Sequence, residues 1–383
     1  MSLINQKERF HFLDGLRGIA SLMIVIHHSL TAAIVKLILR LKIPFAGDFF
    51  HEFTQSGVDL FFVLSGVVLL RPYLRGKRPF ETGDYFIRRL KRIYPPYFFA
   101  LLFGAAVIWY MNTYPTWYNI RGMHQFFSWQ ETIREAFIFS FFGKYYNLAW
   151  WSLQIEVLFY IVVPVIVYCF PKPEKITVRR IVLTILITFV ISFMLQHVIT
   201  AYWWQLYYYK KNLASFGKFI EYPICFLMGI FLASKDFGLK QGYRMVGIGI
   251  LLVATGVILV GKSLVFASVI HSGYGIFYAG IITLAFNVST FKSFLSKPLL
   301  LWLGERSYSL FLIHFSVFYI VDNTISRFLT DRSMLYGTLT RCIGIPAAFF
   351  MAMLLFYFVE RRQARGLVTG DAFWPWQVKK IKT

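Results

Sequence analysis

The chain has 383 residues, of which 57% are hydrophobic and only 15% are charged, and its mean hydropathy is +0.58. Soluble domains are usually about a quarter charged, so this composition excludes an ordinary water-soluble protein. The formal net charge is +22. The basic residues flank apolar stretches, so we interpret this charge as a membrane topology signal and expect no nucleic-acid partner. The three cysteines lie far apart in apolar runs and form no metal-binding or redox motif.

About ten apolar stretches are long enough to cross a bilayer as helices. They cover residues 13–39, 54–72, 94–112, 149–170, 180–201, 217–234, 245–261, 264–287, 299–324 and 336–359. The sequence therefore predicts an all-α polytopic membrane protein, with about ten transmembrane helices in one bundle. Residues 1–362 would form this domain, and residues 363–383 a short basic tail. The first apolar run lacks a small-residue cleavage site, so we expect it to be retained as an anchor.

The distribution of basic residues predicts the orientation of the chain. If the N-terminus is cytoplasmic, most of the 40 Lys and Arg residues fall in segments on that side, above all in the loop 71–92 and after residue 360. Cytoplasmic loops of membrane proteins are enriched in positive charge. Both termini are therefore expected to be cytoplasmic.

Two segments on the expected outer side carry distinct patterns. In the long loop 113–148, Ser128 and Glu131 form a capping-box pattern ahead of a helical run. This predicts a short interfacial helix at the outer surface. The aromatic-rich segment 202–209 is either an aromatic belt at the membrane interface or a stacking surface for sugar rings.

The first span carries ionisable residues where they are costly, and such residues usually mark a functional site or a buried pair. Arg17 and His28 are eleven positions apart, so they share one helix face at a separation of roughly 16 Å along the axis. Asp14 lies close to the same face. We interpret His28 as a general base, with a structural interhelical hydrogen bond as the alternative. His27 points about 100° away and is interpreted as a packing residue. Neighbouring histidines do not predict a metal site.

Further polar residues in the apolar spans and their flanks are candidates for the same site. The Ser65-Gly66 pair in the second span is equally explained by close helix packing. These candidates are Asp59, Ser65, Trp151, Ser152, Glu156, Tyr308 and His314.

The basic loop after the second span has two possible roles. It contains Arg88, Arg89 and Arg92, followed by Tyr94. These arginines either control topology and contact anionic lipid headgroups, or form a cytoplasmic phosphate clamp, because guanidinium groups bind phosphate in a bidentate manner.

Several motifs follow one another along the chain: Leu13 to Ala20 running on to His28, Gly57 to Gly66, Arg89 to Pro95, Trp151 to Tyr160, Leu303 to His314, and Glu360-Arg361. Together, in this order, they resemble the membrane-bound acyltransferase family 3, which includes O-antigen and exopolysaccharide O-acetylases. The family pattern of an arginine, ten residues and a histidine selects Arg17 and His28 rather than His27. The usual glutamate pair is reduced here to Glu156 followed by Val157. The chain ends soon after the last span, so we expect no fused esterase-like domain.

The resemblance implies an integral protein of the bacterial cytoplasmic membrane, surrounded by lipid. Its activity would be transfer of an acyl group, most often acetyl from acetyl-CoA, to a hydroxyl of a cell-surface glycan or its lipid-linked precursor. His28 would deprotonate the acceptor hydroxyl or carry the acyl group itself. Glu156, nearer the outside, would bind sugar hydroxyls or relay a proton. The residues expected to hold or orient the CoA donor are Asp14, Arg17, Arg88, Arg89, Arg92 and Tyr94.

Two other functions stay open at this point. Buried ionisable residues also occur in transporters, so a transporter or flippase for a lipid-linked glycan or small molecule is one alternative. A non-catalytic assembly component is another. The sequence identifies neither the acceptor nor the acyl group, which could be acetyl or succinyl.

Overall fold

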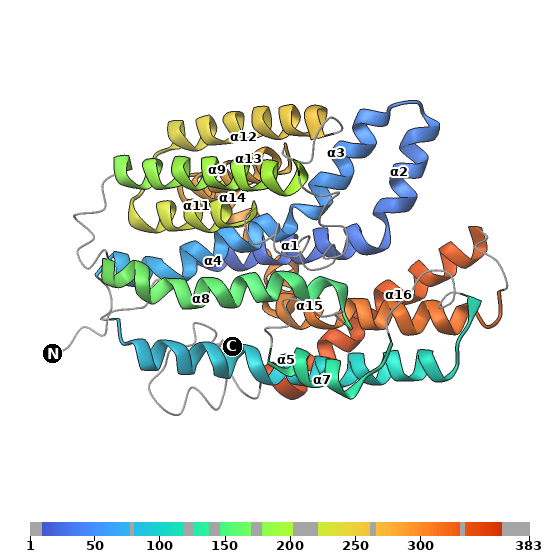
Figure 1. Ribbon diagram of the computed structural model, residues 1–383. Coiled ribbons are helices and arrows are strands. Elements are labelled where there is room, and N and C mark those ends of the chain that lie inside the picture. Colours follow the sequence, from blue (N-terminus) through green and yellow to red (C-terminus); the bar gives the residue numbers. More distant parts are fainter. Residues whose placement is uncertain are drawn as a thin grey trace, which may run out of the picture.

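The computed structural model describes residues 10–76, 80–117, 126–137, 146–169, 178–201, 221–260, 266–329 and 334–361. Helices make up nearly all of these residues and run side by side in one bundle (Figure 1). In chain order they are α1 (His11–Ser29), α2 (Thr31–Arg40), α3 (Pro44–Gln55), α4 (Gly57–Leu74), α5 (Thr82–Thr113), α7 (Trp129–Ala136), η1 (Leu148–Trp150), α8 (Trp151–Cys169), α9 (Val178–Ala201), α11 (Pro223–Ser234), α12 (Leu239–Val260), α13 (Ala267–Asn287), α14 (Ser289–Leu295), α15 (Pro298–Ile325), α16 (Met334–Leu355) and the π-helix η5 (Phe356–Glu360).

The all-α prediction is confirmed for the described part of the chain, but the number of about ten spans is not. Within the described residues, seven helices are long and apolar enough to cross a membrane, or eight if the bent pair α1 and α2 counts as one. The stretch predicted at 217–234 is represented by α11, a shorter apolar helix that begins at Pro223. Both termini, the tail 363–383 and the aromatic segment 202–209 lie outside the described residues.

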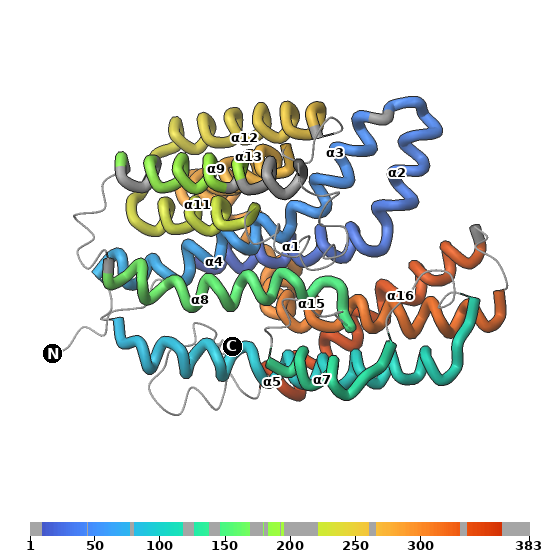
Figure 2. The backbone as a smooth tube through the Cα atoms, viewed as in Figure 1, coloured from blue at the N-terminus to red at the C-terminus, as the bar shows by residue number. Residues whose placement is uncertain are grey.

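The first predicted span is not one straight helix. Its two halves, α1 and α2, meet at Leu30 with a bend of 66°, and α2 then pairs with α3 as a hairpin (Figure 2). Two residues with hydroxyl groups flank the break. Ser29 donates to the carbonyl of Val25, and Thr31 donates to the carbonyl of Ile26. Such back-bonding competes with the helical ladder and bends helices. The bend leaves His27 and His28 in the last turn of α1.

Glycines fix how α1 lies against α15. A Cβ atom added to Gly18 would stand 2.5 Å from the carbonyl oxygen of Leu300, and one added to Gly304 would stand 2.0 Å from that of Asp14. Only glycine permits such an approach of two backbones. The contact sets the register between the polar residues of α1 and those of α15.

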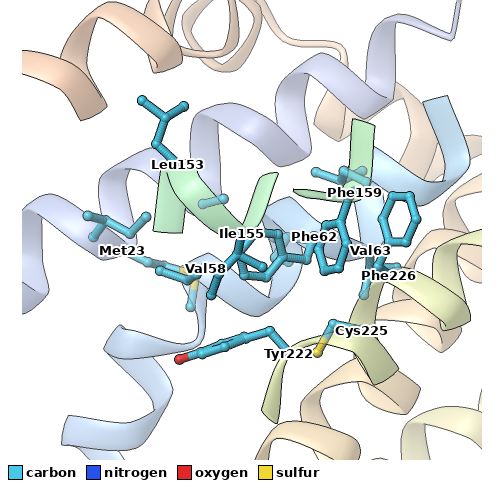
Figure 3. Close-up of a cluster of buried hydrophobic side chains, with 14 of the residues drawn as sticks. Met23, Val58, Phe62, Val63, Leu153, Ile155, Phe159, Tyr222, Cys225 and Phe226 are labelled. Atoms are coloured by element: carbon cyan, nitrogen blue, oxygen red, sulfur yellow. The ribbon is translucent and has the colours of Figure 1, made fainter. Parts of the chain in front are cut away.

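The centre of the bundle is packed with aromatic rings. Phe159 of α8 stacks on Phe226 of α11 at 4.2 Å between ring centroids, and Phe62 of α4 meets Phe159 edge-on (Figure 3). Beside Ser65, Gly66 lets α4 touch α11 directly, since a Cβ there would lie 2.4 Å from the carbonyl oxygen of Phe226. The packing interpretation of this Ser-Gly pair is therefore confirmed for the glycine.

The helix predicted in the outer loop is present as α7, but its surroundings differ from the prediction. Ser128 is the N-cap residue, although its side chain makes no capping hydrogen bond. Tyr94 and Tyr97, which lie near the middle of α5, donate to the carbonyl oxygens of Ala136 and Glu135. The helix is thus held beside the middle of α5 rather than at its outer end. These hydroxyl contacts between distant segments have no local sequence signal.

Candidate active site

Half-buried arginines gather between α1 and α5. Arg17 lies 3.6 Å from the Asp14 carboxylate and is also acted on electrostatically by Arg92. Arg89 lies over the rings of Tyr85 and Tyr160, and its buried Nε has no hydrogen-bond partner among the described residues. A concentration of positive charge with an unused donor fits an anionic group such as a phosphate.

A carboxylate and two tyrosines face this arginine cluster. Glu156 accepts a hydrogen bond from Tyr160 and acts electrostatically on Arg17. Tyr308 donates to the carbonyl of Ile93 at 3.0 Å and lies within the electrostatic reach of Glu156. Glu156 is therefore within electrostatic reach of Arg17, and its expected place nearer the outer side stays a prediction. The chain before α8 is tied into the bundle.

The tie that positions α8 is a single carbonyl of α15. The Leu312 carbonyl oxygen accepts hydrogen bonds from the Asn147 side chain at 2.8 Å and from the indole of Trp150 at 3.1 Å. Trp151 then packs against Tyr222, while Ser152 donates to the backbone of Ala149. Trp151 and Ser152 thus start α8 rather than face the arginines.

Glu360 joins the arginine cluster, although its motif alone did not indicate a site role. It accepts a 2.6 Å hydrogen bond from Ser309 and is acted on electrostatically by Arg92, Arg306 and Arg17. It ends the π-helix η5, and the wider turn of such a segment re-aims side chains, frequently at functional sites.

Four histidines meet at the other end of α1. The ring of His28 stacks on His314 at 5.4 Å between centroids and meets His27 at 4.9 Å, and His27 in turn meets His51 of α3 at 4.9 Å. His27 also forms a 3.1 Å hydrogen bond with Thr54. The expectation that His27 and His28 point into separate surroundings is wrong, because imidazoles on adjacent residues are long enough to touch despite their angular offset. His51 was missed, since nothing in its local sequence links it to α1.

The members of this histidine cluster differ in exposure. The side chain of His28 is exposed, contrary to the expectation of a buried base, whereas His314 is completely buried. The Nδ1 of His314 donates to the carbonyls of Leu310 and Phe311, and its Nε2 has no hydrogen-bond partner among the described residues. Backbone bonds of this kind fix the tautomer and orientation of an imidazole. His28 is thus the accessible ring, and His314 the fixed ring behind it.

Some predicted residues lie away from both clusters. Arg88 pairs with Asp84 at the exposed start of α5, and the Tyr94 hydroxyl is engaged with α7. Neither contact involves the arginine cluster. Asp59 lies in a separate polar centre with His271 of α13 and Cys225 of α11. Ser65 is half-buried on α4.

Comparison with known proteins shows the family of this chain. Residues 10–361 match the family described as "Acyltransferase domain", which covers α1 to the end of η5. The chain belongs to this acyltransferase family. The apolar helices of the acyltransferase further identify it as an integral membrane protein. Among its described residues, no group of three or more His, Cys, Asp or Glu side chains could hold a metal ion.

Two relatives illustrate the similarity. The acyltransferase is 28% identical to the O-acetyltransferase OatA of Staphylococcus aureus over 334 residues, which are 81% of this chain and 51% of the relative. It is 40% identical to "Protein 2 in picA locus" of Rhizobium radiobacter over 106 residues, covering 26% of this chain and 46% of that protein. The chain therefore spans about half the length of the curated relatives it matches. No solved structure matches it.

Proposed function

We propose that this protein is a membrane O-acyltransferase of the bacterial cytoplasmic membrane. It would move an acyl group, acetyl from acetyl-CoA in the simplest case, onto a hydroxyl of a cell-surface glycan or its lipid-linked precursor. The observation that carries the proposal is the accessible His28, placed on the same helix as Arg17 of the half-buried arginine cluster. The name of the relative OatA is consistent with O-acetyl transfer.

The acyl-CoA donor is assigned to the arginine cluster. Its phosphates would face Arg17, Arg89 and Arg92, and the buried Nε–H of Arg89 has no hydrogen-bond partner within the part of the chain that the structure describes. Bidentate guanidinium contacts favour phosphate over neutral groups. The thioester would then extend along α1 toward His28, over the roughly 16 Å that eleven helical residues span. In this orientation the basic start of α5 faces the cytoplasm, in line with the distribution of positive charge.

The chemical step is assigned to His28. The acceptor hydroxyl gives its proton to a ring nitrogen of His28, and the hydroxyl oxygen attacks the thioester carbonyl. The C–S bond breaks, the CoA thiolate leaves, and it takes the proton back from the imidazolium. The products are the acyl ester and free CoA, with His28 regenerated. The buried ring of His314 stacks on His28 and limits its rotation, so we assign His314 a positioning role.

A proteoliposome assay tests this function. The purified protein is supplied with acetyl-CoA labelled in the acetyl group and with envelope glycan from the source cells. We expect one free CoA thiol for each base-labile acetyl ester formed on the glycan. Movement of the glycan across the bilayer without ester formation or CoA release would contradict the proposal and favour a transporter.

A further inference from the structure

A second polar centre lies between α4, α11 and α13, apart from the arginine cluster. Asp59, in the first turn of α4, is completely buried. Its Oδ1 accepts hydrogen bonds from His271 Nδ1 at 2.9 Å and from the thiol of Cys225 at 3.2 Å. Burying a carboxylate in a membrane protein is costly. The buried carboxylate of this centre therefore costs folding free energy, and the proposed acyl transfer at His28 does not use it.

A second carboxylate, that of Glu221, lies on the other side of His271 from Asp59. Nδ1 of His271 donates to Asp59, and the opposite ring nitrogen, Nε2, lies 3.7 Å from the Oε2 of Glu221. Tyr222 packs its ring on His271 at 4.4 Å and also contacts Trp151. A carboxylate, an imidazole and a second carboxylate thus lie in a row beside two aromatic rings.

One polar atom in this centre is left open. The Oδ2 of Asp59 is buried and has no hydrogen-bond partner among the described residues, whereas the buried hydroxyl of Tyr274 interacts with Ser56. Asp59 acts electrostatically on Tyr274, so the two groups are neighbours. Buried polar atoms are rarely left unpaired without a functional reason.

The centre adjoins the histidine cluster through α3. Glu52 lies 3.4 Å from His51, a member of that cluster, and it also acts electrostatically on His271 and Tyr274. The carboxylates of Glu52 and Glu221 are the accessible part of the centre, with side chains 23% and 15% exposed. Glu52, His51 and His27 thus connect the acidic centre to the exposed His28.

The side chains of this centre suit the acyl acceptor rather than the CoA donor. Carboxylates repel the phosphates of CoA but accept hydrogen bonds from hydroxyl groups, and aromatic rings pack against the apolar faces of sugars. We propose that Glu221 and Glu52 bind hydroxyl groups of a neutral, polyhydroxylated acceptor, and that Asp59 and His271 hold Glu221 in position. This inference rests on the proposed acyltransferase function and specifies where its acceptor lies.

Steady-state kinetics of Glu221→Gln and His271→Gln test this assignment. The neutral envelope glycan fraction is titrated at fixed acetyl-CoA, and acetyl-CoA at fixed glycan. Hydrogen bonds to charged groups are worth about 1.5–3 kcal/mol. We therefore expect Glu221→Gln to raise the glycan KM roughly tenfold or more, with the acetyl-CoA KM within about twofold of wild type. His271→Gln should shift the same constant in the same direction. Glu131→Gln, on a glutamate of similar exposure at 24%, is the matched control and should change neither constant.

Three outcomes are distinguishable. A selective rise in glycan KM supports the assignment. An unchanged glycan KM in Glu221→Gln, or an equal rise in both constants, overturns it while the acyltransferase function stands. Absence of acyl transfer by the wild-type protein overturns both. Thermal unfolding of each purified variant separates a specific effect from loss of fold. If His271→Gln is unstable, Glu221→Gln, which keeps the side-chain shape, decides the test.

Discussion

Replacing Gly304 by alanine tests whether the contact of α15 with α1 sets the site. The new Cβ would lie 2.0 Å from the carbonyl oxygen of Asp14 and 2.6 Å from its carbonyl carbon, whereas real contacts are essentially never below 3.0 Å. Both neighbours are backbone atoms, so the two helices must separate by about 1 Å. Overpacking of this kind costs roughly 1–3 kcal/mol.

The same displacement should impair catalysis. Tyr308 and His314 follow Gly304 on α15, and Arg17 and His28 follow Asp14 on α1, so the separation moves one set relative to the other. A misplacement of about 1 Å can cost roughly a hundredfold in rate. We expect Gly304→Ala to unfold at lower temperature in detergent and to transfer acyl groups about a hundredfold more slowly.

Gly247 of α12 supplies the matched control. No atom lies within 4 Å of a Cβ added there, and alanine is a better helix former than glycine by about 1 kcal/mol. Gly247→Ala should therefore leave activity unchanged and leave stability unchanged or slightly higher. Wild-type unfolding temperature and activity in Gly304→Ala would refute the argument that this backbone contact fixes the register of the site.

Three further predictions follow from single contacts. Arg89→Ala should raise the acetyl-CoA KM about tenfold or more, since charge-assisted hydrogen bonds are the strong ones, while Arg88→Ala, on the arginine that pairs with Asp84, should leave it nearly unchanged; equal effects would count against the phosphate role. Tyr97→Phe removes the 2.6 Å hydrogen bond to α7 and should cost about 1 kcal/mol of stability, visible as faster proteolysis at α7. The side chain of Asp236 is 69% exposed. Partial burial raises the pKa of Asp236, but its hydrogen bonds and charge contacts with Arg71 and Arg75 outweigh this effect and hold the pKa below the usual value. The contribution of Asp236 to folding stability is at most about 0.5 kcal/mol at such exposure. This contribution is present above the usual aspartate pKa and is lost as the pH falls through the lower pKa of the folded state. Asp236→Asn should therefore unfold like the wild type at low pH and differ slightly from it at neutral pH.

Local patterns in the sequence were enough to predict the helices and part of the site. The eleven-residue spacing places Arg17 and His28 on one face of a helix because helical geometry is fixed. The Ser65-Gly66 pair of the second span indicated close helix packing, but nothing in the sequence assigned such a role to Gly18 or Gly304. Which backbone each of them touches depends on the whole bundle.

The remaining features depend on contacts between distant segments. The grouping of His51 with His27 requires the bend at Leu30, and the pairing of Asp59 with His271 joins residues more than two hundred positions apart. The approach of Glu156 to Arg17 depends on where α8 begins, and the chain just before α8 makes two hydrogen bonds to one carbonyl of α15. None of these has a periodic or motif signal in a single sequence, so the second polar centre could not be predicted.

The most direct test of the central claim compares His28→Gln with His27→Gln in the proteoliposome assay. The two residues are adjacent and their rings touch, so the substitutions perturb the same place with the same chemistry. A general base contributes roughly 10²–10⁴ in rate. We predict a loss of that size in kcat for His28→Gln and a much smaller loss for His27→Gln. Retained activity in His28→Gln, or an equal loss in both variants, would contradict the assignment of His28 as the base.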